Sequence, residues 1–188
     1  MGFDLKGIKP TGGPIPDEPD WLDDSKYSEM KRKAYFTWQD NTPGAYFRNN
    51  VWYWRPLWKF VCEQCDDILT RKDMEEGISN NGHKISRAKA KRIALRLKEI
   101  NNKLEDFEDK HTKYLKSIPK VDCSVCNGTG LRNDDIGIVA RSKNPEYTCN
   151  GCSGEGKRDD FETHYPFSAS NVRDFAKFCN NSGGFEIC

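Results

Sequence analysis

One eight-residue pattern, C-x-x-C-x-G-x-G, occurs twice in the chain, as Cys123-Ser124-Val125-Cys126-Asn127-Gly128-Thr129-Gly130 and as Cys149-Asn150-Gly151-Cys152-Ser153-Gly154-Glu155-Gly156. Two cysteines three positions apart on a tight turn can direct both sulfurs at one ion, and the glycines let the backbone pass close beneath those sulfurs. Two such turns supply four thiolates, which close a tetrahedral shell and leave no position for a substrate. The repeat therefore predicts one structural Zn²⁺ with the ligands Cys123, Cys126, Cys149 and Cys152; glycine-rich turns with uncoordinated thiols are the alternative.

The remaining cysteines are open to more than one interpretation. The chain has eight cysteines, and six of them form three C-x-x-C pairs. This spacing favours thiolates held on metal in a reducing compartment, so we expect the protein in the cytoplasm, or in the host cytoplasm if it is viral. The third pair, Cys62 and Cys65, falls inside an expected helix, where free cysteines commonly pack in the core. A second metal site completed by Cys179, Cys188 or His83, and a redox role, are the alternatives.

The repeated motif resembles the zinc-binding, cysteine-rich module of DnaJ-type co-chaperones. The resemblance covers residues 123–156 only, and that family normally carries four copies of the motif and two zinc sites, whereas this chain has two copies. The His-Pro-Asp signature of a J-domain is absent from the sequence, so stimulation of a chaperone ATPase is not implied. The resemblance implies zinc ligation by the four cysteines and binding of a protein partner.

Composition excludes some classes of protein. Charged residues make up 31% of the 188 residues and the mean hydropathy is −0.86, so no run approaches the ~20 apolar residues of a membrane helix. Thirty basic and 29 acidic side chains leave a net charge of +1, so the bulk charge indicates no partner. His83, His111 and His164 lie in no setting that suggests a nucleophile–base pair, which favours a non-enzymatic protein and leaves enzymatic activity open.

Residues 86–118 carry the pattern of a long helix. Apolar positions recur at alternating spacings of three and four, at Ala90, Ile93, Leu97, Ile100, Leu104, Phe107, His111, Tyr114 and Ile118. This heptad seam predicts one protruding helix of about 50 Å, ended by Pro119, that leads into the zinc module and could pair copies of the chain as a coiled coil. Its first part, residues 84–98, holds seven basic side chains and no acidic one. Nucleic-acid binding is one interpretation of this stretch, and a solvated or self-complementary face is the other.

Residues 46–58 form the densest aromatic segment, with tyrosine, phenylalanine and tryptophan rings beside arginine and asparagine side chains. Planar rings beside guanidinium and amide groups suit the stacking and edge recognition of a nucleotide. The candidate ligand-binding residues are Arg48, Asn49, Asn50, Trp52, Trp54 and Arg55. A tryptophan-rich core strand and helix start is the alternative, because large aromatic side chains are mostly buried.

Four stretches of the chain resemble a group of uncharacterised bacteriophage-encoded proteins. They are the Met-Gly-Phe-Asp opening, residues 46–58, residues 81–86 and the Gly-Gly-Phe-Glu-Ile-Cys end at 183–188. The resemblance implies a viral accessory or host-interaction role.

Together these patterns predict a helix-rich α+β protein whose N- and C-terminal strands pair in a small sheet. We expect a globular part with the aromatic segment at 1–85, a long helix at 86–118, a zinc module at 119–160 and a C-terminal helix and strand at 161–188. The expected function is non-enzymatic, zinc-dependent binding of a macromolecular partner, most readily a protein, through the zinc module or the long helix. Sequestration of a nucleotide and binding of nucleic acid are the alternatives.

Overall fold

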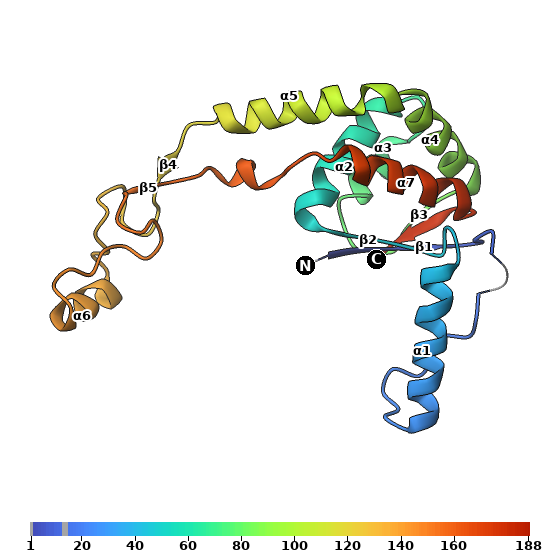
Figure 1. Ribbon diagram of the computed structural model, residues 1–188, viewed down its shortest axis with the longest axis horizontal. Helices are drawn as coiled ribbons and strands as arrows, with labels where there is room; N and C mark the ends of the chain where they lie inside the picture. Colours follow the sequence, from blue (N-terminus) through green and yellow to red (C-terminus); the bar gives the residue numbers. More distant parts are fainter. Residues whose placement is uncertain (1, 13–14) are drawn as a thin grey trace. The chain divides into compact units, whose positions relative to one another are not determined.

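The computed structural model describes residues 2–12 and 15–188; Met1, Gly13 and Pro14, which belong to the expected first strand and the loop after it, lie outside this part. The chain forms two compact units (Figure 1). We call residues 1–110 with 165–188 the core unit, and residues 111–164 the cysteine unit.

A four-stranded antiparallel sheet lies at the centre of the core unit. Its order is β2 (Tyr46–Asn50), β1 (Gly2–Gly7), β6 (Phe185–Ile187) and β3 (His83–Ile85). Leu5 lies opposite Phe47 on one side and Ile187 on the other, so the first and last strands of the chain are neighbours, as predicted. Side chains alternate between the two faces of a strand, and the buried residues Phe3 and Leu5 mark the face that the core covers.

Helices supply most of the remaining structure. The core unit contains α1 (Lys26–Asn41), α2 (Val51–Gln64), α3 (Arg71–Glu76), α4 (Arg87–Glu99), the short 3₁₀ helix η1 (Asn101–Lys103) and α7 (Ala169–Asn181). Helix α5 (Leu104–Ser117) begins in this unit and ends in the cysteine unit. The cysteine unit holds β4 (Val121–Asp122), α6 (Asp135–Lys143), β5 (Lys157–Arg158) and η2 (Phe161–His164). The helix-rich α+β class predicted from the sequence is confirmed.

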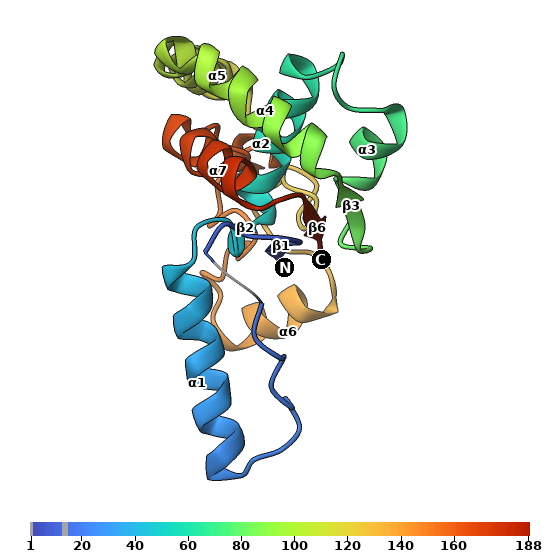
Figure 2. The same cartoon turned by 90° about the vertical axis from the view of Figure 1, so that its right-hand side faces the viewer.

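The hydrophobic core lies between the sheet and the helices α2, α4 and α7, which cover one face of it (Figures 1 and 2). The rings of Trp54 and Trp58 are fully buried and stack with centroids 5.3 Å apart. Phe3 also stacks on Trp54, with centroids 5.3 Å apart, and Phe175 of α7 meets that indole edge-on at 5.8 Å. The aromatic segment therefore supplies the centre of the core.

The predicted continuous helix over residues 86–118 is wrong. Helix α4 ends at Glu99, Ile100 leaves the helical conformation with φ −95° and ψ 8°, and η1 intervenes before α5. The seam residues Ile93, Leu97 and Leu104 are buried in the chain's own core, so they do not form the exposed contact surface of a coiled coil. Asn101 and Asn102 are weak helix formers, and a turn here lets both helices bury apolar side chains.

Candidate metal centre and other predicted sites

The two cysteine motifs form a pair of matched turns, which we call knuckles. Strands β4 and β5 pair with Asp122 opposite Lys157, and so hold the start of the first knuckle beside the end of the second. The backbone N–H of Cys123 donates to the carbonyl of Gly156, and the N–H of Cys149 donates to that of Gly130, both across 2.8 Å. The first cysteine of each knuckle is thus hydrogen-bonded to the last glycine of the other. This reciprocal pair of bonds relates the two knuckles by an approximate twofold symmetry.

The glycines of the motif are explained by the backbone. Gly130 and Gly156 both have φ of +75°, a left-handed conformation that disfavours other residues. A Cβ atom on Gly130 would lie 2.4 Å from the carbonyl oxygen of Gly154, and one on Gly156 would lie 2.3 Å from that of Gly128. The last glycine of each motif is therefore needed for close contact between the knuckles.

The four cysteine sulfurs lie together and are buried. The Sγ atoms of Cys123 and Cys149 are 3.9 Å apart, those of Cys126 and Cys152 are 3.7 Å apart, and all four lie within 4.8 Å of one another. Four sulfurs at ~2.3 Å from a tetrahedral zinc ion would be about 3.8 Å from each other, whereas a disulfide needs ~2.05 Å. The cluster therefore suits one Zn²⁺ ion.

Backbone donors make the cluster suitable for thiolates. The N–H of Gly130 points at Cys126 Sγ across 3.3 Å, and the N–H of Gly156 points at Cys152 Sγ across 3.2 Å. Hydrogen bonds of this kind stabilise the negative sulfur that a metal requires. Four such ligands complete the zinc shell, so the chemistry of this donor set is structural.

Cys62 and Cys65, the candidates for a second metal site, lie at the C-terminal end of α2. Within residues 2–12 and 15–188, the four cysteines of the knuckles form the group of three or more ligands that could hold a metal, and this pair belongs to no such group. Burial raises the pKa of the Cys62 thiol to about 12 and that of Cys65 to about 11, so both are protonated near neutral pH. Their surroundings therefore favour packing over redox chemistry.

The candidate ligand-binding residues are spread over several places. Trp54 is fully buried, Asn49 donates to Asn171 Oδ1 at 2.9 Å, and Asn50 caps α2. Arg48 pairs at 3.6 Å with Asp4. Because neighbouring residues of β2 point to opposite faces of the sheet, Arg48 and Asn49 do not share a face.

Two further members of this set lie near one another. Trp52 packs against Tyr165 with ring centroids 5.1 Å apart, and Arg55 donates to the Tyr165 hydroxyl at 3.0 Å. These two residues share a neighbour, whereas Trp54 lies in the core. The structure thus does not bring the six candidates into one pocket.

Most of the basic side chains of residues 84–98 have partners within the core unit. Arg92 and Arg96 both pair with Asp67, at 3.2 and 3.1 Å. Lys84 pairs with Glu186 at 3.6 Å, and Lys91 donates to Asn180 at 3.0 Å. Charges already paired in the fold offer less to a phosphate backbone, so this pattern favours the interpretation as a solvated, self-complementary face.

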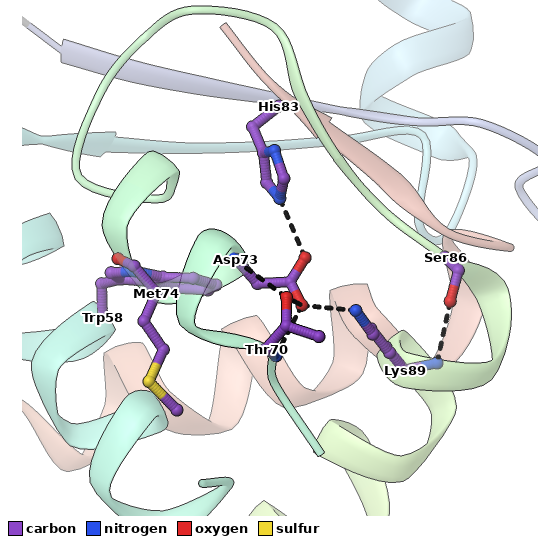
Figure 3. Close-up of polar contacts among 7 residues, drawn as sticks. All are labelled: Trp58, Thr70, Asp73, Met74, His83, Ser86 and Lys89. Carbon is purple, nitrogen blue, oxygen red and sulfur yellow. Dashed lines mark hydrogen bonds and ion pairs between the residues drawn. The ribbon is translucent and has the colours of Figure 1, made fainter.

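The remaining partner, Asp73, organises a polar cluster that sequence reasoning did not single out (Figure 3). Its side chain is 5% exposed and lies 2.9 Å from Nε2 of His83, it pairs with the Lys89 ammonium, and it accepts hydrogen bonds from Thr70. Burial alone would raise the pKa of this carboxyl, but the hydrogen bonds from Lys89, Thr70 and His83 outweigh it and lower the pKa. The cluster ties α3, β3 and α4 together, and the capping-box spacing of Thr70 and Asp73 is the signal that could have located it.

Comparisons with known proteins add no relative. No model of a protein family, no curated protein and no solved structure matches the chain. Among the described residues, no helix is long and apolar enough to cross a membrane. The interpretation of the site therefore depends on its own geometry.

Proposed function

We propose that the protein is a non-enzymatic binding factor whose cysteine unit uses one zinc ion to present an aliphatic surface to a protein partner. The observation that carries this proposal is the orientation of α6, which connects the two knuckles. Its aliphatic side chains are exposed, and the contacts it makes with its own unit come from a glycine and an arginine.

Helix α6 contacts its own unit through Gly137 and Arg141. A Cβ atom on Gly137 would lie 1.9 Å from the carbonyl oxygen of Arg132, and the Arg141 guanidinium donates to the same carbonyl. Ile136, Ile138 and Val139 are 60%, 55% and 55% exposed. A surface helix normally turns its apolar side inward, so this inverted arrangement favours a partner that covers the aliphatic residues.

Zinc is needed to hold such a surface in place. Among the described residues of the cysteine unit, the buried apolar cluster consists of the four cysteines alone. A unit with so small a core cannot offset the entropy of ordering its chain, whereas structural zinc contributes ~10 to 16 kcal/mol in peptide systems. The metal thus takes the place of a hydrophobic core.

The resemblance to DnaJ-type modules supports a protein as the partner. The resemblance of four stretches to bacteriophage-encoded proteins supports a host protein, which would make the chain a viral accessory factor. Each of those stretches contains all or part of a strand of the central sheet. They therefore support a core unit whose fold is shared with those bacteriophage-encoded proteins. In this proposal the cysteine unit determines which partner is bound.

Site-specific photo-crosslinking tests this function. A photoreactive amino acid at Val139 should give a discrete crosslinked partner in cells that make the protein, and Ile136→Asp should remove that product while the zinc content stays unchanged. The matched control places the same probe at Thr112, an exposed position of α5 in the same unit. Identical products from both positions, or none from Val139, would contradict the proposal.

A further inference from the structure

The core unit carries an apolar groove between α4 and α7. It has a volume of about 350 Å³, and the apolar part of its lining comes from Ala94, Leu95, Leu97 and Ala176. The small side chains of Ala94 and Ala176 leave space between the two helices, and Leu95 is 59% exposed at the edge. We call this feature the helix groove.

The charged part of the lining has one sign. Lys98, Arg173 and Lys177 line the helix groove, and no carboxylate does so within the described part of the chain. Arg173 pairs with Glu105 and Lys177 pairs with Asp174, and neither carboxylate belongs to the lining. The Lys177 side chain is 77% exposed, so its ion pair is weak. The groove thus suits an apolar side chain that is flanked by acidic groups.

The chain itself contains a segment in which exposed apolar side chains are flanked by acidic ones. Residues 17–24, Asp-Glu-Pro-Asp-Trp-Leu-Asp-Asp, hold five carboxylates around Trp21 and Leu22. Leu22 is 93% exposed and Trp21 is 46% exposed, so the segment presents apolar and acidic side chains together. We call these residues the acidic tip.

The acidic tip is held in shape before any contact. The hydroxyl of Ser28 donates to the carbonyl of Asp20 at 2.8 Å, and Arg32 donates to the carbonyls of Trp21 and Asp23 at 3.3 and 3.2 Å. The Trp21 ring leans against Phe36 of α1 with centroids 5.6 Å apart. Because the turn is already ordered, docking of Leu22 would cost little conformational entropy.

The tip and the groove lie on opposite sides of the sheet within the core unit. Helices α4 and α7 cover one face, while α1 and the segment before it project from the other (Figures 1 and 2). The tip of one molecule therefore does not reach its own groove. We propose that the acidic tip of one copy of the chain docks in the helix groove of a second copy, with Leu22 between α4 and α7 and its carboxylates beside Lys98 and Lys177.

Sedimentation at a series of protein concentrations tests this contact. The zinc-loaded full chain should associate as its concentration rises, and the association should weaken with salt, which screens exposed charges. Leu22→Asp, which changes a side chain with almost no contacts, should abolish association. Ile78→Asp is the matched control, because Ile78 is also a large exposed aliphatic residue of the core unit; it should associate like the unaltered chain.

Complementation of two variants makes the test specific. The double substitution Lys98→Glu and Lys177→Glu reverses the charge of the groove and leaves the tip intact, whereas Leu22→Asp disables the tip and leaves the groove intact. Each variant should be monomeric alone, and an equimolar mixture should regain association because one intact tip meets one intact groove. A monomeric wild-type chain at every concentration, undiminished association of Leu22→Asp, or a mixture that stays monomeric would overturn the proposal.

Discussion

The amide of Cys123 donates to the carbonyl of Gly156 across 2.8 Å, and this bond joins the start of one knuckle to the end of the other. Gly156, the last glycine of the second knuckle, also points its own N–H at Cys152 Sγ across 3.2 Å. Gly156 thus connects the two knuckles and stabilises one of the four sulfurs. The spacing and the glycines of the motif therefore act as one structural unit.

Gly130→Ala should weaken zinc binding about tenfold. The new Cβ would meet the Gly154 carbonyl oxygen at 2.4 Å, and φ of +75° adds strain of ~1 to 2 kcal/mol, where ~1.4 kcal/mol corresponds to a factor of ten. Competition against a chromophoric chelator measures the affinity. Ser124→Ala is the control, because Ser124 is an exposed residue of the same knuckle; equal losses in both variants would argue against the account.

Removal of zinc should unfold the cysteine unit and leave the core unit folded. The core unit has a large apolar cluster of its own, whereas the described residues of the cysteine unit bury mainly the four cysteines. All five tryptophans lie in the core unit, so their fluorescence reports on that unit alone. A strong chelator should collapse the amide NMR signals of residues 111–164 without a change in tryptophan emission, and a simultaneous change in both signals would contradict this division.

Asp73→Asn should destabilise the core unit by about 2 to 4 kcal/mol near neutral pH, because it leaves Lys89 and His83 without their buried anion. The pKa of Asp73 in the folded chain lies below the ~3.9 of an unfolded aspartate. Its contribution is therefore complete above pH ~5 and is lost progressively as the pH falls below that value.

Urea unfolding followed by tryptophan fluorescence, at a series of pH values, measures this effect. The difference in the free energy of unfolding between the unaltered chain and Asp73→Asn should shrink as the pH falls from ~5 toward ~2. Asp66→Asn serves as the control, because Asp66 is an exposed carboxylate in the turn that follows α2. A difference that stays constant with pH would show that the Asp73 charge does not contribute.

Trp54→Phe should destabilise the core unit by ~1 to 3 kcal/mol beyond the loss of packing area, because the Trp54 indole N–H donates to the buried Gly77 carbonyl at 2.8 Å. Thermal unfolding of the zinc-loaded chain provides the measurement. Trp52→Phe, a change of the same size at a half-buried position, should have a smaller effect. The reverse order would indicate that the aromatic segment is not the centre of the core.

The metal cluster could be predicted from the sequence because its geometry is local. A C-x-x-C-x-G-x-G turn is fixed by glycine conformations within eight residues, so Cys123 and Cys126 converge without help from the rest of the chain. The first and last strands also show local alternation, with Phe3 and Leu5 in one and Phe185 and Ile187 in the other, which predicts the strands themselves. These features depend on short-range chemistry, whereas the pairing of the two strands joins the ends of the chain.

The break between α4 and α5 could not be predicted in the same way. The heptad pattern of Ile93, Leu97, Leu104 and Phe107 fits one long helix and equally fits two helices packed on a common core. Only tertiary burial distinguishes the two, and Phe107 shows the outcome by packing on Phe60 with centroids 5.1 Å apart. The alternation of side chains along β2 likewise places Arg48 and Asn49 on opposite faces of the sheet. Their adjacency in the sequence does not reveal this.

Metal counting on the purified full chain tests the central claim most directly. Elemental analysis together with native mass spectrometry should find one zinc per chain, retained in Cys62→Ser and lost in Cys126→Ser. Zinc that survives in Cys126→Ser and disappears in Cys62→Ser, or a chain purified without chelator that carries no metal and does not bind added Zn²⁺, would contradict the account.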